Sequence, residues 1–197
     1  MSVTAEKLRP AGEATLADLL ALPDEGRGYE IIDGELIEKE TSAEHGVAQS
    51  RISRLLGPFD RRPGGRQPGG WWFATEVLID FGPKQQFRPD VVGWHRERMP
   101  ERPTGVVISV RPDWICEIVS SSNASNDTVR KKRAYHKHQV PHYWLLDPVR
   151  ETLSVLRWSP DGYIEVLSAM RGERVKAEPF DAIEISIGVF FGDDEEE

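Results

Sequence analysis

The 197-residue chain has one cysteine, no long apolar run and an excess of negative charge. Cys116 lies alone within an apolar stretch, which excludes a disulfide framework and a zinc site built from cysteines. No apolar run approaches the roughly 20 residues that span a bilayer, and the first segment, MSVTAEKLRP, has no signal-peptide core. From these absences we expect a cytoplasmic protein that does not enter a membrane.

The net charge is −8, and five of the negative charges lie in the final segment DDEEE. An acidic chain argues against non-specific binding of nucleic acid over its whole surface, but it leaves room for a local basic groove. Basic residues that could form such a groove are Arg61, Arg62, Arg66, Arg96, Arg98, Arg102, Arg130, Lys132, Arg133 and Lys137. The alternative is that they are ordinary solvated surface charges.

Hydrophobic residues make up 39% of the sequence, which is enough for the core of one domain. We expect a loose lead-in over residues 1–14, a single domain over 15–192 and an acidic tail over 193–197. Helical periodicity predicts helices over 15–23, 42–59 and 125–139. Strand-like runs occur at 71–81, 89–94, 113–120 and 142–147, within GVVISV, and as hairpins over 29–40 and 152–168. This order is typical of an α/β protein with a mixed central sheet flanked by helices.

A glutamate inside an apolar strand is the first sign of a functional site. Glu117 lies in the run WICEIV, where an ionised carboxylate is costly unless a metal ion or another cation pairs with it. Asp90 begins a second apolar run, PDVV. If these strands are neighbours, the two carboxylates converge in a way that suits Mg²⁺. The alternatives are a buried pair with an arginine for Glu117 and backbone amide partners for Asp90.

The basic segment that follows supplies a positive charge. Asp127, Lys131 and Tyr135 are spaced to share one face of a helix. A lysine beside a metal-bound water can stabilise the hydroxide and the charge that develops on a phosphate. Two carboxylates, a metal ion and a lysine are sufficient for phosphodiester hydrolysis. The alternative for Lys131, within the run RKKR, is a solvated helix face.

The sequence resembles the PD-(D/E)xK nuclease superfamily, and more closely a large bacterial family of predicted restriction endonucleases. The motifs that carry the resemblance, in order, are YEIIDGEL, RPDVV, WICEIVSSS, K-x3-Y and YWLLDP, and it covers roughly residues 29–190. It implies a restriction-endonuclease-like fold, with additional β-hairpins, and hydrolysis of DNA that depends on Mg²⁺ or Mn²⁺ but on no small-molecule cofactor. Asp90 and Glu117 match the metal ligands, and the carbonyl oxygen of Ile118 matches a further one.

One position departs from the superfamily pattern. Its usual lysine would fall two residues after the glutamate, where this chain has Val119. The resemblance implies that the lysine comes instead from the next helix, as Lys131 or, as a second candidate, Lys132. If neither side chain reaches the metal ion, the alternative function is a catalytically inactive module with the nuclease fold that binds nucleic acid or protein.

Further candidates follow from the same resemblance. Glu30 or Glu35 could contact the metal ion through water, and His45 could orient a water or contact a phosphate. The candidates for binding nucleic acid are Arg130, Arg133 and Lys137. A homodimer is expected by analogy, since cutting two strands needs two sites.

Overall fold

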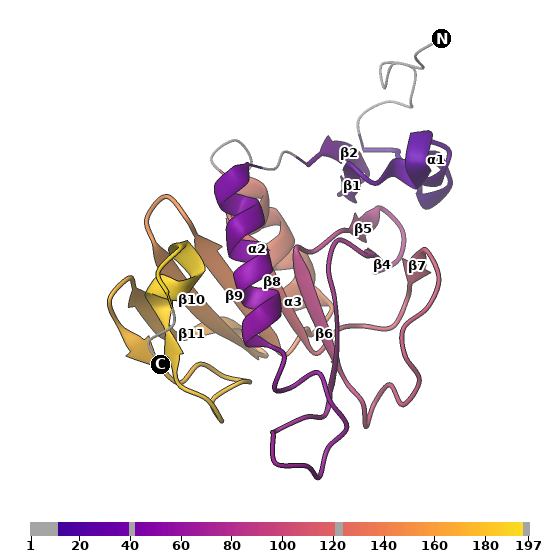
Figure 1. Cartoon of the computed structure of the whole chain (residues 1–197). Helices are drawn as coiled ribbons and strands as arrows, with labels where there is room; N and C mark the ends of the chain where they lie inside the picture. The colour runs from indigo at the N-terminus through magenta and orange to yellow at the C-terminus, as the bar shows by residue number, and fades with distance from the viewer. Residues whose placement is uncertain (1–11, 40–41, 121–123, 195–197) are drawn as a thin grey trace.

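The computed structural model describes residues 12–39, 42–120 and 124–194, so the expected lead-in and tail lie largely outside the described residues. Within these ranges, no helix is long and apolar enough to cross a membrane. Figure 1 shows a broad sheet with helices on it and a smaller group of strands beside it, near the N-terminal part of the chain.

The larger sheet has six strands in the order β11-β10-β9-β8-β6-β3. They are β3 (Trp71–Ala74), β6 (Val91–His95), β8 (Trp114–Ile118), β9 (His142–Asp147), β10 (Thr152–Ser159) and β11 (Gly162–Met170). β8 and β9 run parallel and the other neighbouring pairs run antiparallel. This confirms the predicted mixed central sheet.

A second sheet has five strands in the order β2-β1-β5-β4-β7. They are β1 (Tyr29–Ile32), β2 (Glu35–Glu38), β4 (Leu78–Asp80), β5 (Gln85–Phe87) and β7 (Val107–Ile108). β1 and β2 form the predicted hairpin, with both turn residues, Asp33 and Gly34, at positive φ. A small sheet pairs β12 (Arg174–Val175) with β13 (Ile185–Ser186).

The prediction of one continuous strand over residues 71–81 is wrong. β3 pairs with β6 in the larger sheet, whereas β4 pairs with β5 and β7 in the smaller one. The chain changes sheets between them, and Glu76 adopts a left-handed conformation with φ of 54°. The break therefore places a glutamate at the junction of the two sheets.

The helical segments are α1 (Leu16–Leu20), η2 (Pro23–Gly26), α2 (Ala43–Leu55), η3 (Asn126–Lys131), α3 (Lys132–Lys137) and η4 (Ile187–Phe191). Ser42 caps α2 as predicted, because its side chain accepts a hydrogen bond from the backbone N–H of His45. The predicted helix over 125–139 is present, but its first part, η3, is a π-helix. Its first turns are therefore wider than the α-helix that the sequence spacing implied.

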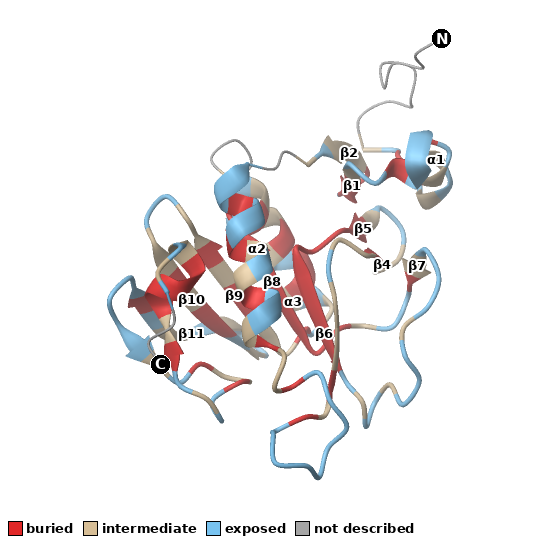
Figure 2. Ribbon diagram, in the orientation of Figure 1, coloured by how far each residue is buried: buried red, intermediate tan, exposed pale blue. Residues whose placement is uncertain are grey.

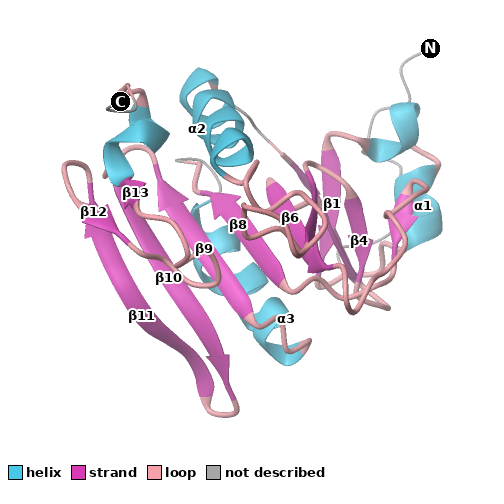
Figure 3. Ribbon diagram, turned by 60° about the horizontal axis from the view of Figure 1, so that its bottom comes forward, coloured by secondary structure: helices cyan, strands magenta, loops and turns pink. Residues whose placement is uncertain are grey.

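α2 and α3 lie on opposite sides of the larger sheet (Figure 3), and the central strands β6 and β8 are buried between them. Trp114, Cys116 and Ile118 belong to the core cluster that contains residues of α2. Ile115 belongs to the cluster that contains residues of α3. Because side chains alternate along a strand, Glu117 lies on the α3 side. The double burial, visible in red over β6 and β8 in Figure 2, explains why the strand around Glu117 is otherwise apolar.

Candidate metal-binding and catalytic site

Two paired strands bring the predicted carboxylates together. β6 and β8 are antiparallel with Val91 opposite Cys116, so Asp90 and Glu117 lie beside each other at one end of the pair. Both residues are 1% exposed. Asp90 Oδ2 accepts a hydrogen bond from the backbone N–H of Ile118 at 2.6 Å. Asp90, Glu117 and Ile118 line one small cavity, which is the convergence that the sequence predicted.

Lys131 enters the same cavity from η3 and is 2% exposed. Its Nζ lies 2.8 Å from Glu30 Oε1, 3.1 Å from Asp127 Oδ1 and 3.3 Å from Glu117 Oε2. The hydroxyl of Tyr135 donates to Glu117 Oε1 at 2.5 Å. Lys131 is therefore not on a solvated helix face, and Glu117 pairs with this lysine and a tyrosine instead of an arginine.

A second lysine, with 10% of its side chain exposed, lies on the other side of Asp90. Lys39 follows β2, and its Nζ lies 2.8 Å from Glu76 Oε2, 2.9 Å from Asp90 Oδ1 and 2.6 Å from the carbonyl oxygen of Arg88. Gln49 Nε2, from α2, donates to Glu76 Oε1 at 3.1 Å and to the carbonyl oxygen of Asp90 at 2.8 Å. Sequence reasoning identified neither Lys39 nor Glu76 nor Gln49 as part of a site.

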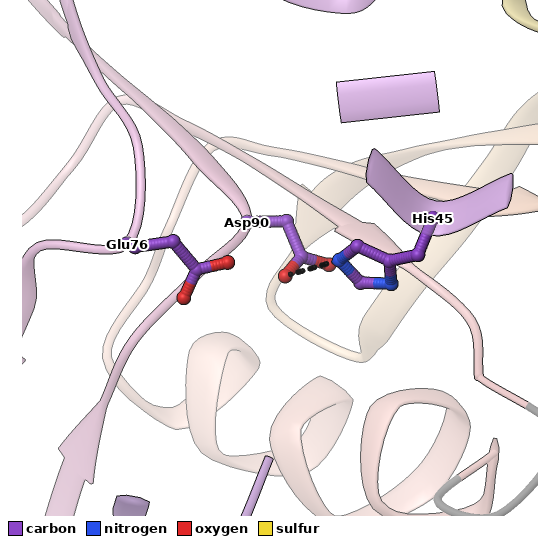
Figure 4. A group of neighbouring side chains, drawn as sticks. All are labelled: His45, Glu76 and Asp90. Carbon is purple, nitrogen blue, oxygen red and sulfur yellow. Dashed lines mark ion pairs between the residues drawn. The ribbon is translucent and has the colours of Figure 1, made fainter. Parts of the chain in front are cut away.

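His45 reaches the site from the first turn of α2. Its Nε2 lies 3.0 Å from Asp90 Oδ1, whereas Nδ1 makes no hydrogen bond with the described residues, although His45 is only 5% exposed. Figure 4 shows the Asp90 carboxylate between the His45 ring and Glu76. One ligand atom from each of these three residues lies within 4.8 Å of the others, a spacing that could hold a metal ion.

Burial and neighbouring charge set the protonation of the central carboxyls. Burial raises the pKa of Glu117 well above its usual range, and the opposing effect of Lys131 does not cancel it. Burial acts in the same direction on Asp90, but Lys39 and His45 together hold the pKa of Asp90 well below its usual range. Burial would lower the pKa of Lys131, but Glu117 and the other carboxylates raise it well above its usual value, so Lys131 stays an ammonium.

The residues of this site fit a divalent cation. The site contains five carboxyl groups and two ammonium groups, a formal charge of −3 when all are ionised: Glu30, Glu76, Asp90, Glu117 and Asp127 against Lys39 and Lys131. A buried excess of negative charge is costly, and a divalent cation would compensate two thirds of it. His45, with Nε2 3.0 Å from Asp90 Oδ1, adds an imidazole ligand beside these carboxylates.

Two of the predicted candidates lie outside the cavity. Glu35 is on the surface, where Arg130 Nη2 lies 2.8 Å from its Oε2. Lys132 lines a separate pocket between η3, α3 and the β10–β11 hairpin. Of the adjacent lysines, only Lys131 therefore contacts the buried carboxylates. The structure places Glu30 and His45, the other secondary candidates, inside the cavity.

Part of the candidate basic groove is already neutralised by ion pairs within the chain. Arg96 pairs with Asp60, Arg98 with Asp113, and Arg130 with Asp33 and Glu35. Arg133 and Lys137 are exposed on α3. Beside the cavity, a cleft of about 740 Å³ shares Lys39 and His45 with it and is also lined by Arg27 and Arg88. This cleft provides space for a substrate next to the buried carboxylates.

Comparisons with known proteins agree with this architecture. The family model named Uma2, described as "Putative restriction endonuclease", matches residues 16–188. A crystal structure described as a putative nuclease belonging to DUF820, from Anabaena variabilis, superposes with a TM-score of 0.70 at 23% sequence identity, covering 90% of this chain and 97% of that one. No curated protein matches the sequence. At this identity the structural likeness shows a shared fold.

Proposed function

The chain belongs to the Uma2 family of putative restriction endonucleases, and from that membership and the site geometry we propose that it is a divalent-metal-dependent endonuclease acting on DNA. The observation that carries the proposal is the meeting of Asp90, Glu117 and the buried Lys131 in one cavity. The three residues come from separate elements, before β6, within β8 and at the end of η3. They are far apart in the sequence, and the fold brings their side chains into one cavity.

The carboxylates of Asp90 and Glu117 and the carbonyl oxygen of Ile118 would hold Mg²⁺ or Mn²⁺, which bind oxygen ligands. Such an ion lowers the pKa of a bound water and polarises a phosphate oxygen. The hydrogen bond from the Ile118 N–H fixes the orientation of the Asp90 carboxylate. Tyr135 similarly holds one oxygen of Glu117 and leaves the other to Lys131.

Lys131 would take the role of the superfamily's usual lysine, whose position is occupied by Val119 in this chain. Of its three carboxylate contacts, the one to Glu117 is the longest, at 3.3 Å. Glu117 can therefore turn toward a cation while Glu30 and Asp127 continue to hold the ammonium in place. From this position Lys131 stabilises the negative charge that develops on the phosphate during attack.

Arg130, Arg133 and Lys137 are the candidate phosphate contacts for DNA, and they lie on η3 and α3, outside the cleft beside the cavity. Arg133 and Lys137 are the stronger of these, because Arg130 is already paired with two carboxylates. A homodimer would place two such sites on one duplex.

One observation favours a second function, a nuclease-fold module that binds nucleic acid without cleaving it. All three N–H donors of the Lys131 ammonium face carboxylates within 3.3 Å. If those contacts persist when a metal ion binds, no donor is left for a phosphate. The module would then bind DNA and a cation but leave the phosphodiester intact.

Nicking of supercoiled plasmid distinguishes the two functions. We expect the wild-type protein to nick plasmid with Mg²⁺ or Mn²⁺ and not with EDTA, and Asp90→Asn to abolish nicking. Asp181→Asn, an exposed aspartate outside the site, is the matched control and should retain wild-type activity. Equal nicking by wild type and Asp90→Asn would contradict the proposal, and DNA binding without any nicking would favour the inactive module.

A further inference from the structure

Lys39 fills a position that resembles a second metal site. Its Nζ lies 2.8 Å from Glu76 Oε2 and 2.9 Å from Asp90 Oδ1, two members of the His45, Glu76 and Asp90 group. The third contact, at 2.6 Å, is to the carbonyl oxygen of Arg88. An ammonium has three N–H donors, and here each has an oxygen acceptor. The lysine is therefore held as an ion is held by its ligands.

We propose that Lys39 is a built-in cation that takes the place of a second metal ion, so that the site binds one divalent ion, between Asp90 and Glu117. The proposal rests on the proposed metal-dependent function for the first ion only. In this arrangement Lys39 acts through the two carboxylates that it contacts. It is a positioning residue that keeps Asp90 and Glu76 in place on the side away from Lys131.

The distribution of charge supports the binding of one ion, and it places this ion near Lys131 and not near Lys39. Around Lys39 there are two carboxylates, Glu76 and Asp90, and one ammonium, a formal charge of −1. Around Lys131 there are three carboxylates and one ammonium, a formal charge of −2 when all are ionised, as they would be with a metal ion bound. Since attraction in a buried site grows as the local dielectric falls, a divalent cation gains most on the Lys131 side.

His45 provides an independent observation about the Lys39 side. Its ring is buried beside Asp90, with Nε2 3.0 Å from Asp90 Oδ1, and its Nδ1 has no hydrogen-bond partner among the described residues. An ammonium cannot serve an imidazole nitrogen and both carboxylates together with the Arg88 carbonyl, because it has only three donors. Removing the ammonium would leave an imidazole and two carboxylates within 4.8 Å, a ligand set that suits Mn²⁺ or Co²⁺.

Metal stoichiometry tests this directly. Mn²⁺ binding is measured by titration calorimetry and by electron paramagnetic resonance on the purified full chain, for wild type, Lys39→Met and Lys39→Met/His45→Ala. Methionine keeps an apolar side chain of similar length without the charge. The matched control is Lys176→Met, an exposed lysine outside the site, and circular dichroism verifies that every variant is folded.

We expect one Mn²⁺ per chain for wild type and the control, two for Lys39→Met and one for the double variant. With Co²⁺, Lys39→Met should also gain visible absorption bands that disappear in the double variant. Two ions in wild type, or an unchanged count in folded Lys39→Met, would overturn the inference. No ion in wild type but one in Lys39→Met would refute the metal-dependent function while supporting the role of Lys39.

Discussion

Lys39 and Lys131 divide the buried carboxylates of the site into two groups that meet at Asp90 and Glu117. The Lys39 side chain is 10% exposed and the Lys131 side chain is 2% exposed. Burial raises the pKa of Glu117 and Lys131 does not cancel this effect, whereas Lys39 and His45 together outweigh burial at Asp90. Two adjacent carboxyls thus differ in protonation because their partners differ.

The raised pKa of Glu117 predicts a dependence of stability on pH in the metal-free protein. A carboxyl whose pKa is higher in the folded chain than its unfolded value of about 4.3 contributes its full stability below that value, and the contribution is lost as pH rises through the folded pKa. Replacing Glu117 by Gln removes this titration. The free energy of unfolding of wild type minus that of Glu117→Gln should therefore fall as pH rises from about 4, by about 1.4 kcal/mol per unit of pKa shift.

The measurement is urea unfolding in EDTA across that pH range. If the free energy of unfolding depended on pH in the same way for wild type and Glu117→Gln, burial would not raise the pKa of Glu117.

Among the secondary-structure elements, α2 supplies two residues of the site, His45 and Gln49. Ser42 fixes where this helix begins, through the hydrogen bond that His45 N–H donates to its side chain at 3.2 Å. The N-cap thus stabilises the helix and positions the histidine at once.

Ser42→Ala should lower the free energy of unfolding by about 1 kcal/mol, the usual cost of losing an N-cap. The same change at Ser53, an exposed position inside the helix, should have little effect or stabilise slightly, because alanine is the better helix former. Chemical denaturation of both variants checks this. An equal loss from the two substitutions would mean that Ser42 acts only as another helix-surface serine.

The elements were predictable where hydrophobic pattern and turn chemistry agreed, as in the Asp33-Gly34 hairpin and the strand around Glu117. The change of sheet at Glu76 was not, because Thr-Glu-Val contains neither glycine nor proline and reads as continuous strand. Lys39 was missed for a similar reason, since a lysine between two glutamates after a hairpin is normally solvated. Its burial depends on contacts with Glu76 and Asp90, which are 37 and 51 residues away.

Across the full chain, a net charge of −8 makes DNA binding depend on a few local cations. Arg133→Ala and Lys137→Ala should each weaken DNA affinity and reduce the slope of log affinity against log salt by about 1, because each would remove one phosphate contact. Fluorescence anisotropy at several salt concentrations measures this. Lys176→Ala, an exposed lysine on a different part of the fold, should leave the slope unchanged, and a salt slope unaffected by both α3 substitutions would place the DNA elsewhere.

The comparison of Lys131→Met with Lys132→Met in plasmid nicking is the most direct test, because these adjacent lysines differ in burial and surroundings. Lys131→Met should reduce the Mg²⁺-dependent rate by about 10²-fold or more. Since it also leaves three buried carboxylates without a cation, it should cost about 3–5 kcal/mol of stability, so the assay is run at a temperature at which both variants are folded. Lys132→Met should nick at close to the wild-type rate. Full activity in folded Lys131→Met, or loss of activity in Lys132→Met alone, would contradict the assignment of Lys131 as the catalytic lysine.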